Sequence, residues 1–68
     1  MELLTTFKTK VTEVVYVFED GTSRFHYGEW VDNKGKVYDS ILRDIDGNEI
    51  NDPSLLEEVQ NFVDTLKQ

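Results

Sequence analysis

The sequence contains no cysteine and only one histidine. Without cysteine, neither disulfides nor thiolate metal sites can support a small core. No apolar run approaches the ~20 residues that a membrane-spanning helix needs. The N-terminus also lacks the basic start and apolar stretch of a signal peptide. We therefore expect a soluble, cytoplasmic protein with no membrane contact.

Basic residues are also scarce, because 14 acidic side chains oppose 7 basic ones and the net charge is −7. This balance argues against sequence-independent binding to nucleic acid, which requires Lys and Arg to neutralise phosphates. The 68 residues predict a single small domain over 1–68. Hydrophobic residues make up 38% of the chain, which is enough for a folded core.

Three turn signals divide the first fifty residues, and two of them contain Asp-Gly, a strong hairpin signal. They lie at residues 19–22, 32–35 and 46–48. The segments between them are rich in β-branched and aromatic residues, as is typical of strands. The predicted strands are residues 10–18, 22–31 and 36–45, and a short fourth strand at 49–50 is an open alternative.

Alternation of side chains assigns residues to the two faces of each predicted strand. In the second strand, Phe25, Tyr27 and Val31 share one face and His26 and Trp30 share the other. The third strand is predicted to place Val37, Ile41 and Ile45 on one face and Tyr38 and Leu42 on the other.

The first predicted strand is apolar on both faces. One face carries Val14, Tyr16 and Phe18, and the other carries Val11, Val15 and Val17. One helix covers only one side of a sheet, so something else must cover the second. The candidates are the N-terminal segment, a ligand or a second copy of the chain, and a homodimer is the simplest of these. A β-bulge that changes the alternation would also resolve the problem.

Two questions about the N-terminal segment and the helix start stay open at this stage. Leu3, Leu4 and Phe7 either extend the first strand or cap one end of the core. Asp52 before Pro53 predicts the start of a helix over residues 53–67. Ser54 with Glu57 offers an alternative capping box one turn later. The helix carries one apolar stripe formed by Leu55, Leu56, Val59, Phe62, Val63 and Leu66.

These elements predict an α+β fold, in which a three- to four-stranded antiparallel β-meander packs against one C-terminal α-helix. The order of four strands followed by a helix resembles the single-strand-binding transcription coactivator fold in topology. No motif of that family is present in the sequence. The acidic balance of the chain also argues against transferring that family's function.

From Asp44 to Leu66 every charged side chain is acidic. We call six of these residues the acidic array: Asp44, Asp46, Glu49, Glu57, Glu58 and Asp64. The field of such an array attracts basic partners and raises association rates. The alternative interpretation is that these charges solvate the helix, with Asp52 and Glu57 also complementing the helix dipole.

A second candidate surface is an aromatic and basic strand face made of Arg24, His26, Trp30 and Tyr38. Aromatic rings beside cations form a platform on which single-stranded bases stack. The competing interpretation treats Trp30 as a core or dimer contact.

The sequence matches no known pattern for catalysis, cofactor binding or metal binding. The segment 44–49 does not match a calcium loop in either alignment. Counted from Asp44, glycine falls at position four and Leu55 at twelve; counted from Leu42, glycine is correct but the first ligand is leucine and position twelve is Pro53. His26 has no cysteine to activate and no companion ligands at metal-binding spacing. No glycine-rich phosphate loop is present. We expect no enzyme activity, no cofactor and no metal.

The sequence thus favours a non-catalytic acidic module that binds a basic surface of another protein. Small size and acidity are typical of compact inhibitors from viruses, phages or mobile elements, some of which mimic nucleic acid. A single-stranded nucleic-acid-binding domain and a homodimeric structural subunit are the alternatives.

Overall fold

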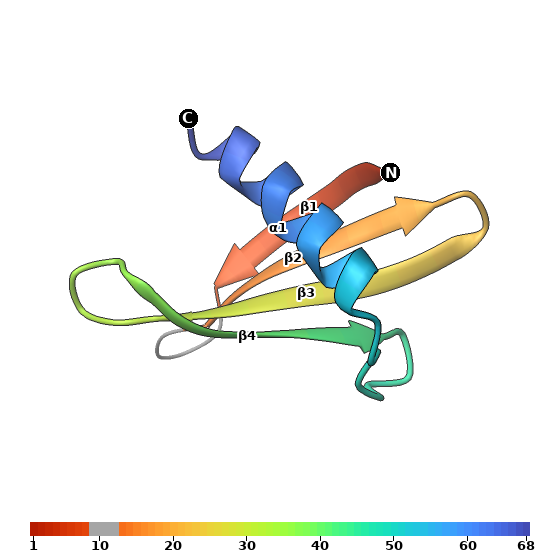
Figure 1. Ribbon diagram of the computed structural model, residues 1–68, viewed down its shortest axis with the longest axis horizontal. Coiled ribbons are helices and arrows are strands. Elements are labelled where there is room, and N and C mark those ends of the chain that lie inside the picture. Colours follow the sequence, from red (N-terminus) through yellow and green to blue (C-terminus); the bar gives the residue numbers. More distant parts are fainter. Residues whose placement is uncertain (9–12) are drawn as a thin grey trace.

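A computed structural model describes residues 1–8 and 13–68 of the chain. It contains strands β1 (Glu2–Lys8), β2 (Glu13–Asp20), β3 (Ser23–Val31) and β4 (Val37–Asp44), followed by helix α1 (Pro53–Leu66). The strands form one antiparallel sheet in the order β1-β2-β3-β4, and α1 crosses one face of it (Figure 1). The predicted α+β meander with a C-terminal helix is confirmed.

The N-terminal segment forms the separate strand β1 and pairs with β2. The segment therefore does not extend the first predicted strand, whereas Leu3 does pack against the core, opposite Phe18. That predicted strand began at residue 10, and residues 10–12 lie outside the described part of the chain. At 49–50, where the sequence left a fourth strand open, Glu49 makes an isolated antiparallel bridge to Arg43.

Asp side chains organise the two turns around β4. Asp32 Oδ1 accepts backbone N–H groups from Lys34 and Lys36, each at 2.9 Å. Asp44 Oδ1 accepts those of Asp46 at 3.0 Å and Asn48 at 2.9 Å. Such Asx turns fold the chain back sharply, and they place β4 between β3 and the segment that leads into α1.

Helix α1 begins where the Asp-Pro pair predicts. Asp52 is the N-cap, and its side chain accepts the backbone N–H groups of Ser54 and Leu55 at 3.1 Å each. Pro53 occupies the first turn, where a missing N–H costs nothing. Of the two predicted caps, the structure therefore uses Asp52. The helix ends at Leu66, one residue before the predicted end.

The core lies between α1 and the inner face of the sheet. Its largest fully buried side chains are Tyr27, Phe18, Leu42, Val59 and Val63. The rings of Phe18 and Phe62 meet edge to face with centroids 5.4 Å apart, which joins β2 to the helix. Burying an apolar side chain of this size contributes about 1.5–3 kcal/mol, so this layer is the main source of stability.

The other side of the sheet, which we call the outer face, carries Val15, Val17, His26, Gly28, Trp30, Ile41 and Arg43. The two-sided alternation predicted for residues 14–18 is confirmed, because Val14, Tyr16 and Phe18 pair with inner-face residues of β3. Strand β1 extends the sheet sideways at the edge of β2. The N-terminal strand therefore does not cover the outer face.

The face assignment predicted for β4 was wrong. The pairing register shifts between Trp30 and Val31, so Val37 lies opposite Val31 while Ile41 lies opposite Gly28. Val37 consequently faces the helix side and Ile41 the outer face. Ile45 follows the end of the strand and is 65% exposed. A shift of one residue moves a side chain to the opposite face, because strands alternate with a period of two.

Candidate functional site

The helix presents the acids of the array on two different flanks. Glu57 and Asp64 are seven residues apart, so they lie two turns apart on nearly the same side of α1. Asp64 borders a hollow together with Gln60, whose side chain hydrogen-bonds Ser40 of β4 at 3.2 Å. Glu57 and Asp64 therefore face the β4 flank. Glu58 lies on the opposite flank of the helix.

The acids of the turn after β4 play different parts. Asp44 is half-buried and its carboxylate holds the turn through the two backbone hydrogen bonds described above. Asp46 and Glu49 are exposed. The structure therefore assigns Asp44 a structural contact and leaves Asp46 and Glu49 at the surface, on the same edge as Glu57 and Asp64.

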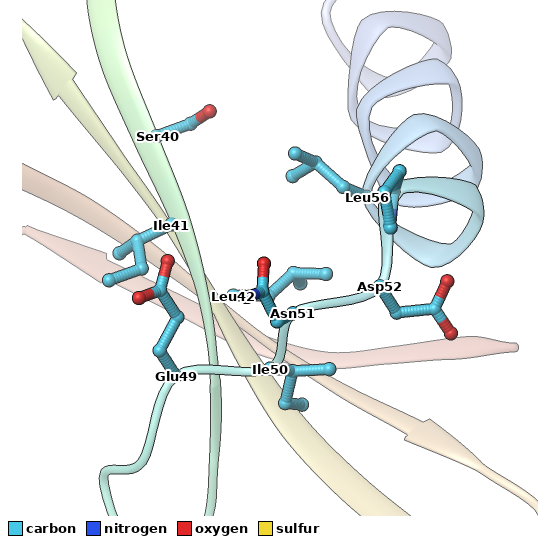
Figure 2. A pocket seen from close by; sticks show the side chains of 9 residues that line it. Ser40, Ile41, Leu42, Glu49, Ile50, Asn51, Asp52 and Leu56 are labelled. Atoms are coloured by element: carbon cyan, nitrogen blue, oxygen red, sulfur yellow. The ribbon is translucent and has the colours of Figure 1, made fainter.

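A hollow of about 120 Å³ lies between β4 and the segment that leads into α1. Figure 2 shows the Glu49 carboxylate beside Ile41 on β4, while the Asp52 carboxylate points away from the strand. The two carboxylates therefore do not converge on one point. Pockets for small molecules measure about 300–1,000 Å³, so this hollow is too small to hold an ordinary ligand.

The position of the acids on α1 is not explained by the helix dipole. No acidic side chain lies in the first turn, where negative charge is favourable. Asp64 instead lies near the C-terminal end, where negative charge is unfavourable. The helix dipole therefore does not account for the position of Glu57, and it disfavours that of Asp64.

Cations of the outer face are already paired with carboxylates. Arg24 Nε donates to Glu19 Oε2 at 3.0 Å, and Arg43 Nη1 lies 3.6 Å from Glu13 Oε2. Arg43 also lies over the indole ring of Trp30, with its guanidinium carbon 5.7 Å from the ring centroid. A stacking nucleobase would have to displace this guanidinium.

The structure brings three residues of the aromatic and basic face together and leaves the fourth apart. Arg24, His26 and Trp30 all lie on the outer face of β3. Tyr38 lies at the register shift of β4 and is 63% exposed. Gly28, on the same face of β3, leaves room for the Glu13 side chain, because a Cβ at Gly28 would come within 2.5 Å of Glu13 Oε2. Glu13 thus crosses over Gly28 toward Arg43.

Glu29 is a buried acid that the sequence interpretation missed. It is 4% exposed, and it accepts a hydrogen bond from the Tyr27 hydroxyl at 3.1 Å and from Lys67 Nζ at 2.8 Å. A hollow of about 230 Å³ lies beside this cluster. The available signal was its place in the alternation Phe25-Tyr27-Glu29, which sets a carboxylate among core-facing residues.

This cluster shifts the ionisation of its neighbours. Burial, and next the nearby charge of Glu29, raise the pKa of Tyr27 to about 12. The same two causes raise the pKa of Tyr16. Partial burial alone would lower the pKa of Lys67, but its hydrogen bond to Glu29 and the charge of that residue outweigh burial and raise it. The cluster therefore joins the end of α1 to β3.

In residues 1–8 and 13–68, no group of three or more His, Cys, Asp or Glu side chains is arranged to hold a metal ion. The segment 44–49 folds as an Asx turn, with Gly47 at a φ of 89°. The described part of the chain also contains no helix of sufficient length and apolar character to cross a membrane.

Comparison with known proteins does not assign this chain to a family. No family model matches the sequence, and no curated protein or solved structure matches it. Function must therefore be inferred from the residues and contacts described above.

Proposed function

We propose that this protein is a non-catalytic binding module whose acidic flank docks a basic surface of another protein. The docking surface consists of Asp46, Glu49, Glu57 and Asp64, with Glu58 on the adjoining flank of α1. The observation that carries the proposal is the separation of charge between the two sides of the molecule.

The ion pairs of the described residues leave the acidic array out. Within the described residues, the ion pairs use Glu13, Glu19, Asp20 and Glu29, and none uses a member of the acidic array. Arg24 and Arg43 of the sheet are thus paired with sheet carboxylates, while the β4 flank and the helix keep the negative charge of the array. A surface of one sign steers partners of the opposite sign and suppresses others.

The position of the acids supports binding over folding. A negative charge near the end of a helix reduces stability by some tenths of a kcal/mol, and Asp64 occupies such a position. A partner whose cations meet this flank would offset that cost. Basic grooves that hold phosphates have suitable chemistry, so the module would act as a decoy for nucleic acid on a nucleic-acid-binding protein.

The test measures binding of a short fluorescent oligolysine peptide by anisotropy at low salt. The decisive variant carries Glu57→Lys and Asp64→Lys. Its matched control carries Glu2→Lys and Asp20→Lys, which change the net charge equally but lie on β1 and β2, away from the β4 flank. We expect the decisive variant to weaken binding about tenfold or more, which corresponds to roughly 1.4 kcal/mol, and the control to weaken it much less.

Glu58→Lys alone locates the surface more finely, and we expect it to weaken binding less than Glu57→Lys does. Circular dichroism of each variant shows whether the fold is kept. Equal loss in the decisive and control variants would mean that net charge alone attracts the peptide, and the proposed surface would be rejected. Quenching of Trp30 fluorescence by a single-stranded oligonucleotide, without peptide binding, would favour the nucleic-acid alternative.

A further inference from the structure

The hollow beside Glu29 has a volume of about 230 Å³ and lies between the C-terminal half of α1 and the strands β3 and β4. Small-molecule pockets measure about 300–1,000 Å³. This hollow is smaller, so it suits a single side chain better than a free ligand. Its walls come from both strands, from α1 and from the residue after the helix: Tyr27, Glu29, Val37, Gln60, Asp64 and Lys67.

The hollow already holds an ammonium group that the chain itself supplies. Lys67 Nζ donates to Glu29 Oε1 at 2.8 Å, while the Tyr27 hydroxyl donates to Glu29 Oε2 at 3.1 Å. Val37 adds an apolar wall, and the methylene groups of lysine pack well against such surfaces. The site therefore has the chemistry of a recess that binds lysine.

Lys67 is held less firmly than the carboxylate that it contacts. Its side chain is 42% exposed, whereas Glu29 is buried. Its backbone N–H donates to the Val63 carbonyl at 3.1 Å, so the helix fixes its main chain and leaves the side chain free to rotate. Side chains at a surface change rotamer rapidly. Lys67 can therefore leave the hollow without movement of the sheet or the helix.

We propose that Lys67 is an internal competitor for a lysine side chain of the basic partner, which enters the hollow and replaces Lys67 on Glu29. This inference rests on the proposed docking of a basic surface at the acidic flank. Asp64 belongs to both places, because it is part of the docking surface and also borders the hollow. A cation drawn to the flank therefore arrives beside the hollow.

The competition controls how strongly Glu29 contributes to binding. A buried carboxylate attracts a cation more strongly than a solvated one, because the local dielectric is lower. In the wild type, however, the entering lysine replaces an equivalent contact. Lys67 is also tethered to the site, which gives it a high effective concentration. The recess therefore discriminates against isolated basic side chains and favours partners that also engage the acids of the flank.

Anisotropy of the fluorescent oligolysine peptide at low salt tests the competition on the full chain. Lys67→Met removes the competitor, and we expect it to tighten binding about tenfold. The matched control is Arg24→Met, which removes one positive charge and one ion pair on the outer face. The control should tighten binding about twofold or less, because it changes only the net charge.

Two double variants locate the gain while keeping the net charge of the wild type, since each loses one base and one acid. Lys67→Met with Glu29→Gln should bind the peptide like the wild type, because the buried carboxylate is gone. Lys67→Met with Glu19→Gln should keep most of the gain, because Glu19 lies on β2 and does not line the hollow.

Circular dichroism accompanies each variant, because Lys67→Met leaves Glu29 without its cation and an uncompensated buried charge is destabilising. If Lys67→Met does not fold, Lys67→Gln takes its place and Arg24→Gln becomes the control. The amide of glutamine keeps a neutral hydrogen-bond donor near Glu29, and the same comparison of affinities applies.

Equal affinities of Lys67→Met and Arg24→Met would overturn the inference, because net charge alone would then explain the gain. A gain that survives Glu29→Gln would overturn it as well. Neither result rejects the acidic flank, which Glu57→Lys tests at a residue that does not line the hollow. Weaker binding in Glu57→Lys, without a difference between Lys67→Met and Arg24→Met, would keep the flank and reject the hollow.

Discussion

Glu29 and its partners show how one buried acid is tolerated in a small core. The carboxylate is enclosed by β3 and the end of α1, and it receives the Tyr27 hydroxyl and the Lys67 ammonium group. An uncompensated buried charge is strongly destabilising. Two donors from different elements therefore satisfy Glu29. Burial and the charge of Glu29 in turn raise the pKa of Tyr27.

At the residue scale we predict a loss of stability in alkali that depends on Tyr27. Folded Tyr27 keeps its proton up to a pKa of about 12, whereas unfolded tyrosine loses it near pH 10. Between these values the folded state binds more protons, so the free energy of unfolding falls as pH rises. The fall is on the order of 2 kcal/mol, and urea unfolding from pH 9 to 12 measures it.

Tyr27→Phe should flatten this dependence, while Tyr38→Phe, which removes an exposed tyrosine, should leave it unchanged. The slope against pH is the readout, because Tyr27→Phe also removes the hydrogen bond to Glu29 and lowers stability at every pH. Lys67 contributes in the same direction: its raised pKa means that its contribution is complete below about pH 10.4 and is lost above. An unchanged slope in Tyr27→Phe would contradict the assignment.

Helix α1 depends on a well-formed start and one apolar stripe. Its N-cap contacts satisfy two backbone N–H groups that would otherwise lack partners. Val59 and Val63 are fully buried on the sheet, whereas the opposite side of the helix is exposed. A helix of 14 residues is marginal in isolation, so both the cap and the packing are needed.

At the element scale, Asp52→Ala should lower the free energy of unfolding by about 1 kcal/mol. Asp52→Asn should restore most of the loss, because an asparagine side chain also accepts N–H bonds at the N-cap. The matched control is Asp46→Ala, which removes the same charge from the exposed turn. Urea denaturation measures all three variants, and equal losses at both aspartates would count against a capping role.

On the scale of the whole molecule, charge is arranged unevenly. The ion pairs of the described residues lie on the sheet and at the end of α1, while the β4 flank keeps unpaired acids. Repulsion among like charges destabilises a compact state and is screened by salt. Stability should therefore depend on ionic strength in the direction opposite to that of a protein held by ion pairs.

We predict that raising sodium chloride from low to moderate concentration increases the free energy of unfolding by up to about 1 kcal/mol. A variant with Glu57→Gln and Asp64→Asn should be more stable at low salt and should respond less to added salt. Urea unfolding at matched ionic strengths provides the measurement. A fall in stability with salt would indicate that the ion pairs of the sheet outweigh the repulsion.

The sequence predicted the local features of the fold correctly because each depends on neighbouring residues. The turns follow from Asp and Gly at fixed positions, the helix start follows from Asp52 and Pro53, and the alternation in β2 follows from a period of two. The same pattern assigned Ile41 and Val37 to one face wrongly. A register shift depends on how β3 pairs with β4, and no local pattern reports it.

Tertiary structure alone decided the relations between distant residues. It formed β1 as an edge strand, joined Lys67 to Glu29 and placed Arg43 over Trp30. The sequence by itself determined the excess of acids after residue 44 and the lack of catalytic motifs. Composition and spacing determine which groups are available, whereas pairing in space determines which charges are neutralised and which remain for a partner.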